Sequence, residues 1–481
     1  MMGHVIGSSR VQLALFPEAL DDLVPADHAV RVIDVFVGTL DLGALKFSKV
    51  EAEATGRPAY HPGDLLKLYI YGYLNQIRSS RKLAREAKRN IEVLWLTGRV
   101  APSFKTIADF RKDHGLAIIG VCRVFIGFCR GHGLFGGELL AIDGTKIAAV
   151  ASRKQVMTPK RIARIAKAID DKIAGYLKAM DDADGQERAT EPNPMDSPVD
   201  VKAALEALQN KRQDLQQLAR TFKREGIKQK VMSEPDAKLM RTAGHGHQVA
   251  YNAQTAVDAK HKLIAAFDLV NDGNDAQQLY PMAVQGKEAV AAKKVTVVAD
   301  AGYSNGAHGE RCAADAITAI VPRPETVNAK NKDHFSRDRF TYDATTDSWQ
   351  CPAGETLTRR KTSHTEAKVK YWSKACGSCR LKSQCTSAAK RVIVRSFHED
   401  AREAMHRRAV ENTRWMELRR EIVEHPFAGI KWLMGHPRFL LRGLVKAKSE
   451  LALSVLGYNL KRTINILGVP ALLKALQPAT S

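Results

Sequence analysis

The sequence has few cysteines, no long apolar segment and no sign of a secretory leader. Seven cysteines in 481 residues are odd in number, and four of them lie between residues 351 and 385. This usage is typical of a reducing compartment with at most one thiolate metal site, and it argues against a disulfide framework. No apolar run reaches the ~18 residues of a transmembrane helix. The N-terminus lacks the charged, apolar and small-residue regions of a signal peptide. We therefore expect a cytoplasmic protein with no membrane partner.

Acidic residues are in short supply relative to basic ones. The chain has 74 Lys and Arg against 52 Asp and Glu, a formal net charge of +22. An excess of this size predicts a polyanionic partner. Because no segment is apolar enough to span a membrane, we favour a nucleic acid over a membrane surface. The length of 481 residues leaves room for about three domains and for a sizeable core.

Two apolar segments rich in branched residues each carry one aspartate. Residues 139–149 are typical of a buried strand with Asp143 in its middle, and residues 295–303 of a strand with Asp300 at its end. A buried carboxylate is costly unless it is paired or binds a metal. Either aspartate alone is more simply explained as the cap of a following turn. The two together favour a divalent metal held between neighbouring strands.

The order of the predicted elements indicates an α/β fold. After the Asp143 strand, two strands form a hairpin at 248–257 and 263–270, and a helix extends to about residue 292. The Asp300 strand, a helix and a last strand at 317–321 follow. This is the order of the ribonuclease H-like fold, a mixed sheet with helices packed on it. Asp143 then lies on its first strand and Asp300 at the end of its fourth. The predicted catalytic core comprises residues 136–152, 246–321 and 396–467.

Residues 1–135 are predicted to form a helical N-terminal domain. A helix that Asp64 could cap and a helix capped by Ser103 are its clearest elements. Short helices, small turns and clustered Arg and Lys are compatible with a helix-turn-helix DNA reader. An ordinary helical bundle with a basic surface fits the pattern equally well. Only the charge of the whole chain favours DNA binding here.

Residues 153–245 predict an inserted helical hairpin. Apolar residues keep helical spacing from Thr158 to Met180 and again from Val201 to Phe222, and a polar segment with Pro192 and Pro194 separates the two runs. The hairpin could be an arm for dimerisation or for DNA. A plain structural insertion is the simpler interpretation. Residues 468–481 are treated as a C-terminal tail.

Residues 322–395 interrupt the α/β pattern with a second insertion, which contains Cys351, Cys376, Cys379 and Cys385. The central pair has the CxxC spacing of zinc sites, whereas the other two cysteines have no standard spacing. We predict a structural Zn²⁺ held by the four thiolates. The alternative is four reduced cysteines that only pack.

The third acidic residue is expected on a helix near the C-terminus. Arg420 and Glu424 are four residues apart and Lys431 lies seven beyond Glu424, so a helix places them roughly on one face. Pro426 is expected to bend that helix locally. Taken alone, the pattern is more simply explained as a salt bridge on an exposed helix.

These motifs together resemble the bacterial insertion-sequence DDE transposases, in the branch with a Tyr-x2-Arg-x3-Glu-x6-Lys signature. Arg420, Glu424 and Lys431 match that signature, and the Asp-Gly-Thr of Asp143 and the Asp-x-Gly-Tyr of Asp300 match the family's first two acidic motifs. The resemblance extends from about His61 to Leu467 and includes Thr106–Arg111, the cysteine segment, Met434–Gly435, Phe439–Gly443 and Tyr458–Leu460.

The chain departs from the signature at one position. Glu417 stands where the family has Tyr, a residue thought to help hold the DNA backbone. This puts that contact, and full activity, in question. Helical geometry does not choose between Glu417, Glu421 and Glu424 as the third acid. Glu424 is favoured because Arg420 and Lys431 stand at the family spacing from it.

The resemblance implies a transposase that cuts transposon ends and transfers the strands into target DNA. Asp143, Asp300 and Glu424 would hold two Mg²⁺ or Mn²⁺ ions, which prefer hard oxygen ligands. Arg420 and Lys431 would contact phosphates. The implied partner is double-stranded DNA at the nucleoid, bound by a homodimer at the transposon ends. Two alternatives stay open: a ribonuclease H-like nuclease without strand transfer, and a decayed transposase that only binds DNA.

Overall fold

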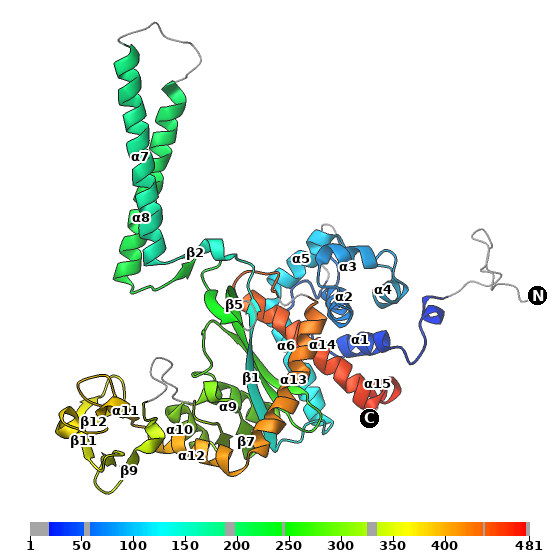
Figure 1. Cartoon of the computed structure of the whole chain (residues 1–481). Coiled ribbons are helices and arrows are strands. Elements are labelled where there is room, and N and C mark those ends of the chain that lie inside the picture. The colour runs from blue at the N-terminus through cyan, green and yellow to red at the C-terminus, as the bar shows by residue number, and fades with distance from the viewer. Residues whose placement is uncertain are drawn as a thin grey trace, which may run out of the picture.

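The computed structural model shows a mixed α/β core, helices packed around it, and two units that project from it (Figure 1). One projecting unit is a long helical hairpin, and the other is a small β unit that contains the cysteine segment. The N-terminal segment 1–18 and the predicted link with Pro192 and Pro194 lie outside the described residues. The structure describes residues 19–51, 58–187, 198–242, 246–324, 334–435 and 438–477.

Strand β1 (Leu139–Ala148) lies inside the six-stranded sheet of the core. It pairs antiparallel with β5 (Gly246–Asp258) on one side and parallel with β7 (Val295–Val298) on the other. The register places Ala141 opposite Val298. The sequence pattern predicts every strand of this sheet except β4. The remaining strands are β8 (Ile317–Ile320), β6 (Ile264–Val270) and β4 (Lys238–Thr242). Strand β8 is parallel to β7. Strands β6 and β4 pair antiparallel with different parts of the β5 edge that faces away from β1.

Helices cover both faces of this sheet. Helix α9 (Leu279–Ala289) packs on the face of the sheet that carries the Leu140 side chain. A Cβ added to Gly286 would lie 2.7 Å from that side chain, so this close approach requires glycine. Helix α13 (Arg414–Met434) contacts β1 and β7 and reaches Asp143. Successive side chains of a strand point to opposite faces, so α13 covers the face opposite α9.

The N-terminal part of the chain is helical. His61, and not Asp64, caps α2 (Pro62–Leu74): its Nδ1 accepts a backbone N–H of the first turn, whereas Asp64 lies within that turn. Ser103 caps α5 (Phe104–Asp113), as the sequence predicts. The other helices of this part are α1 (Ala29–Gly38), α3 (Ser80–Glu86), α4 (Ile91–Leu96) and α6 (Gly115–Gly131).

Helix α14 (Leu444–Leu467) joins the N-terminal helices to the core. It packs against α2 and α6 on one side and against β6 on the other. The segment treated as a tail contains a further helix, α15 (Val469–Leu476), which packs on α1. No single helix in the described ranges is long and apolar enough to cross a membrane; only α5 and α6 taken as a pair, bent by 74°, meet the length and composition.

A buried ionic cluster fastens these parts together. Glu450 on α14 lies 3.9 Å from Arg78 and 3.9 Å from Arg111, and its carboxylate accepts the backbone N–H groups of Leu440 and Leu441 at 2.9 and 2.6 Å. Burial raises the pKa of Glu450, and the two arginines oppose that shift. The arginine of the Thr106–Arg111 motif is therefore a buried structural residue and lies away from the surface that DNA could reach.

Asn459 on α14 closes the edge of β6. Its Oδ1 accepts the N–H of Ile264 at 2.9 Å, and its Nδ2 donates to the C=O of the same residue at 2.9 Å. Asn459 is fully buried. One amide side chain thus takes the place of the next strand of the sheet at Ile264.

We expect Asn459→Ala to lower the free energy of unfolding by about 2–3 kcal/mol, because two buried backbone groups lose their partners. Urea denaturation followed by circular dichroism measures the change. Asn210→Ala, at an exposed position of α8, is the matched control and should shift stability by less than about 0.5 kcal/mol. Equal effects of the two variants would contradict the capping role.

The hairpin consists of α7 (Pro159–Glu187) and α8 (Pro198–Arg224). The two helices are held together by an apolar seam of their own, separate from the main core, and a short two-stranded sheet closes their base. In Figure 1 the hairpin extends away from the rest of the molecule. The seam contains Ile162, Ile169, Leu215 and Phe222, and the short sheet consists of β2 (Val156–Met157) and β3 (Lys230–Val231).

The second projecting unit is a five-stranded antiparallel sheet with its own small core, a structure that the sequence pattern does not predict. It follows α10 (Gly306–Ala314) and β8, and it leads into α12 (Glu399–Glu411), which packs on α10. Its elements are β9 (Thr341–Asp343), β10 (Ser348–Gln350), β11 (Thr356–Ser363), β12 (Lys368–Trp372), α11 (Lys382–Cys385) and β13 (Ile393–Ser396).

Candidate active site

The pairing of β1 with β7 brings Asp143 and Asp300 to equivalent positions along the two strands. Ala141 on β1 lies opposite Val298 on the parallel neighbour β7, and each aspartate follows its partner residue by two positions. Asp143 lies within β1, and Asp300 follows the end of β7 and caps the short 3-10 turn that comes next. The capping interpretation of Asp300 is therefore true, and it does not exclude the pairing with Asp143.

Both carboxylates meet one guanidinium. Nη2 of Arg419, on α13, lies 2.9 Å from Oδ2 of Asp143 and 3.4 Å from Oδ2 of Asp300. The other oxygen of each aspartate is held by the backbone: Oδ1 of Asp143 accepts the N–H of Gly144 at 2.8 Å, and Oδ1 of Asp300 accepts the N–H of Gly302 at 2.8 Å. Each aspartate thus keeps one oxygen fixed and presents the other to a cation.

The charge of the buried Asp143 is stabilised by the guanidinium of Arg419. Burial raises the pKa of Asp143, and the negative charges of Asp300 and Asp275 raise it further, while Arg419 and the N–H of Gly144 oppose them. The Arg419 side chain is only 12% exposed, and its Nε has no hydrogen-bond partner. Keeping Asp143 ionised in this position therefore depends on the positive charge of Arg419.

A third aspartate is fixed on the opposite face of β1. Oδ1 of Asp275 accepts from Nδ2 of Asn252 and Nε2 of Gln254, both at 2.7 Å, and Lys146 lies 3.1 Å from its other oxygen. A Cβ on Gly144 would lie 2.9 Å from Asp275 and closer still to Gln254, so glycine is required there. The glycine of the Asp-Gly-Thr motif therefore makes room for this polar network.

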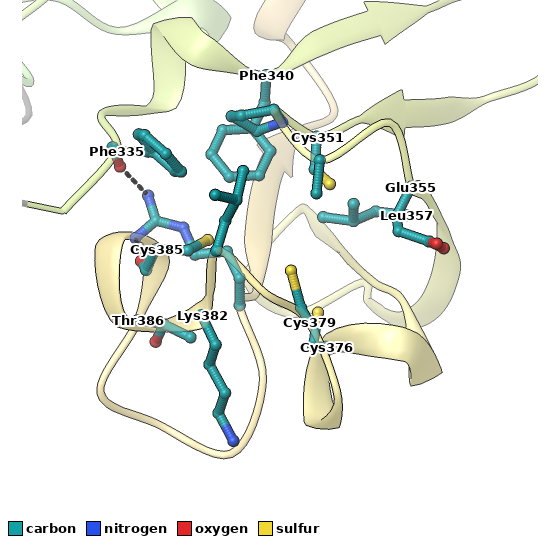
Figure 2. Close-up of a pocket in the computed structure, with 14 residues that line it drawn as sticks. Phe335, Phe340, Cys351, Glu355, Leu357, Cys376, Cys379, Lys382, Cys385 and Thr386 are labelled. Atoms are coloured by element: carbon teal, nitrogen blue, oxygen red, sulfur yellow. Dashed lines mark hydrogen bonds between the residues drawn. The ribbon is translucent and has the colours of Figure 1, made fainter.

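The four cysteines of the small β unit line one cavity (Figure 2). Cys351 comes from the turn after β10, Cys376 and Cys379 lie next to each other after β12, and Cys385 ends α11. All four are free thiols. Burial raises the pKa of Cys385, and the other three thiols add to the effect. The sequence segment that suggested zinc thus gathers its cysteines around a single space.

Known families match two parts of this chain. Residues 18–113 match a family described as a transposase domain (DUF772), and residues 350–464 match one described as a transposase DDE domain. These matches support a DDE-type transposase. The second match covers the cysteine segment, α13 and most of α14, whereas Asp143 and Asp300 lie between the two matched ranges.

The chain is also similar to a solved structure of a transposase. A cryo-EM structure of the piggyBac transposase synaptic complex with hairpin DNA matches 95% of this chain and 83% of its own, at 9% sequence identity and a TM-score of 0.33. This score is too low to bear on the fold. No protein of curated function matches the chain.

The DDE assignment predicts a third acid at the pair, and the structure places Glu424 elsewhere. Glu424 is exposed, as are Arg420 and Lys431, with which it shares one face of α13. It follows Arg419 by five residues, which is about 140° around an α-helix and ~7.5 Å along it. Within the described ranges, no three His, Cys, Asp or Glu side chains are placed to hold a metal ion as they stand. This applies to the predicted acidic triad and to the four cysteines.

Arg419 is the site residue that sequence reasoning missed. It shares a helical stripe with Ile422, Val423, Pro426 and Ile430, all of them buried. A charged residue in register with such a stripe is directed at the sheet, and this signal was present in the sequence. The exposed neighbour Glu421 instead pairs with Lys262 at 2.9 Å.

Arg419→Gln should lower the free energy of unfolding by about 1–2 kcal/mol in chelator-containing buffer, because two close carboxylates lose their shared cation. The cost is below that of a fully buried pair, since Asp300 is 47% exposed. Arg420→Gln removes the same charge from the next, exposed position and should cost less than about 0.5 kcal/mol. Urea denaturation of both variants is the test, and equal destabilisation would contradict the assignment.

Proposed function

We propose that this chain is a transposase that cleaves DNA at transposon ends and joins them to target DNA by metal-dependent phosphoryl transfer. The observation that carries the proposal is the convergence of Asp143 and Asp300, from neighbouring parallel strands, on a single cation position. That position is held by the guanidinium of Arg419. A cytoplasmic location at the nucleoid follows from the substrate.

The sheet topology supports a ribonuclease H-like core. Strand β5 is antiparallel to β1, whereas β7 and β8 run parallel to it, and the strands stand in the order β6-β5-β1-β7-β8. Helices lie on both faces. In this arrangement the first and fourth strands of the core are neighbours, so an aspartate on each can act on the same phosphate.

The donor set at the pair suits Mg²⁺ or Mn²⁺. Carboxylate oxygens are the ligands that these ions prefer, and the two Oδ2 atoms already share one positive partner. Two such ions bound here would supply the activation of the attacking hydroxyl or water and the stabilisation of the leaving oxygen in an in-line displacement. Asp143 and Asp300 would hold those ions through their Oδ2 atoms, while the backbone-bound Oδ1 atoms keep both side chains from turning away.

Glu424 is the proposed third acid, and it can reach the pair only if α13 turns about its axis. The same rotation would withdraw Arg419 from Asp143. Arg420 and Lys431 are exposed on the Glu424 side of α13 and are proposed to contact DNA phosphates. Binding by a homodimer at the transposon ends is part of the proposal, since strand transfer needs both ends.

A second candidate is a decayed transposase that binds DNA without cutting it. Two observations favour it: Glu417 stands at the position of the family's Tyr, and Glu424 lies apart from the two aspartates. A nuclease of the same fold would cut DNA that carries the transposon ends, unlike the decayed transposase. It would form no strand-transfer product, unlike the active transposase.

We expect Asp143→Asn, Asp300→Asn and Glu424→Gln each to abolish Mg²⁺-dependent nicking of supercoiled plasmid and to leave DNA affinity unchanged within about twofold, because each removes a metal ligand and no phosphate contact. Glu421→Gln is the matched control and should keep most of the activity. Activity in Glu424→Gln with loss in Glu421→Gln would reverse the assignment. A wild-type protein that binds DNA and never nicks it would favour the decayed alternative.

We also propose that the cysteine cavity holds a structural zinc ion. Four free thiols around one space form a donor set that zinc prefers, and binding would draw them to tetrahedral geometry. One equivalent of zinc should copurify and be lost from the Cys376→Ser/Cys379→Ser double variant. Cys312→Ala, outside this cavity, should retain it. Elemental analysis that finds no zinc in freshly purified, unchelated protein would rule the site out.

A further inference from the structure

The charge of the helical hairpin is concentrated where it leaves the core. We call residues 153–167 and 219–230 the foot, and residues 168–178 and 203–218 the shaft. The foot contains 11 Lys and Arg and one acidic residue, Glu225, whereas the shaft contains four basic and four acidic residues. The hairpin is therefore close to neutral along its shaft and strongly basic at its foot.

The basic side chains of the foot are mostly unpaired. Within the described residues, the only ion pair of the foot joins Arg224 and Glu225. The described residues of the shaft also contain one ion pair, Arg212 with Asp170 at 2.6 Å, but there the basic and acidic residues are equal in number. In the foot, Arg161 alone turns inward, to backbone carbonyls. The other cations of the foot are Arg153, Lys154, Lys160, Arg164, Lys167, Arg220, Lys223, Lys228 and Lys230.

A purely structural hairpin gives no reason for this arrangement. Lys160 and Arg164 are four residues apart, as are Arg220 and Arg224, and like charges at that spacing destabilise a helix by roughly 0.2–0.5 kcal/mol per pair. The helices pack through Ile162 and Phe222, and by helical geometry these basic residues lie on the outward sides. Two copies of such a surface would repel each other, so the foot is not a surface through which two copies of the hairpin pair with each other.

The foot is held rigidly to the strand that carries Asp143. The side chain of Arg161 donates to the carbonyl groups of Arg153, Lys154 and Val156 at 3.2, 2.9 and 3.0 Å, which fixes the corner between β1 and α7. Deeper in the structure, the buried carboxylate of Glu234 accepts the N–H of the residue at position 151 at 2.9 Å.

The same carboxylate also accepts from the hydroxyl of Tyr251 on β5, at 3.0 Å, and from the N–H of Gly443 at 3.4 Å. Glu234 is 1% exposed. It therefore joins the two segments that flank the foot, at residues 151 and 234, to the central sheet and to the segment between α13 and α14. Strand β1 ends at Ala148, only a few residues before the foot begins. A ligand bound at the foot is thus fixed in position relative to Asp143.

We propose that the foot of the hairpin binds the phosphate backbone of duplex DNA and holds it in register with the Asp143–Asp300 pair. This inference rests on the proposed function and names a surface that the function needs. Unpaired cations on a rigid element attract the phosphate backbone without reading its sequence. The basic residues on the outer side of each helix can contact phosphates on both flanks of the hairpin.

The test is the salt dependence of DNA binding by the full chain, measured as fluorescence anisotropy of a labelled duplex in the presence of chelator. The foot variant is Lys160→Gln/Arg164→Gln/Lys167→Gln, and the matched shaft variant is Lys172→Gln/Lys178→Gln/Lys211→Gln. Each removes three exposed positive charges from the same hairpin. The slope of log affinity against log salt should fall by about 2–3 in the foot variant, because each phosphate that the protein neutralises adds roughly 0.9 to that slope. The shaft variant should keep the wild-type slope.

Equal slopes for the foot variant and wild type, or an equal fall in both variants, would overturn the inference. Circular dichroism checks that the hairpin keeps its helices, and Arg220→Gln/Arg224→Gln tests the same foot from α8 if the first variant fails to fold. The two levels of failure are distinguishable. A wild-type chain that does not bind DNA refutes the proposed function, whereas a wild-type chain that binds and nicks DNA while the foot variants bind as tightly refutes only the role of the foot.

Discussion

The contact of Arg419 with Asp143 and Asp300 is the interaction on which the rest of the site depends. Parallel pairing of β1 with β7 places two carboxylates at one level, and a guanidinium neutralises them. The contact also fixes the rotation of α13, because Arg419 lies on the same stripe as the buried Ile422 and Val423. Packing and charge therefore select the same orientation of this helix.

That orientation has a consequence for catalysis. With Arg419 directed at the sheet, Glu424 faces solvent beside Arg420 and Lys431. An α-helix cannot present residues five positions apart to one point. Arg419 and Glu424 are thus alternatives at the Asp143–Asp300 pair. A divalent cation that displaces Arg419 would remove one of the two interactions that hold the present rotation, and the packing of Ile422 and Val423 would remain. Such a site would be stable without metal and would reorganise when metal and DNA bind.

Much of the fold can be predicted from the sequence because the signals for these elements are local. Branched apolar runs identify β1 and β7, and with them Asp143 and Asp300; helical spacing identifies α7 and α8. Prediction from the sequence fails for elements and contacts that depend on residues far along the chain. Strand β4 is recognisable only from its pairing with β5, and the sheet around the cysteines has no apolar alternation strong enough to predict it. Arg111 looks like part of a basic surface and is instead buried against Glu450, because burial of a charge depends on a partner far along the chain.

In the candidate site, too, local patterns are predictable from the sequence and long-range contacts are not. Spacing finds the residues that a family signature shares, but it does not say which face of α13 meets the sheet. That choice depends on the whole stripe from Arg419 to Ile430, and the acidic residues of the helix alone do not reveal it. The network of Asp275 with Lys146, Asn252 and Gln254 is not predictable from spacing, because its members come from three separate segments. Only the glycine at position 144 hints that something approaches β1 closely.

The most direct test of this account is a crystal structure of the chain with Mn²⁺ and a transposon-end duplex, in which anomalous scattering locates the metal. We expect a manganese peak between the Oδ2 atoms of Asp143 and Asp300, with the Arg419 guanidinium displaced from both. A structure in which Arg419 still bridges the two carboxylates, and manganese binds elsewhere or not at all, would contradict it.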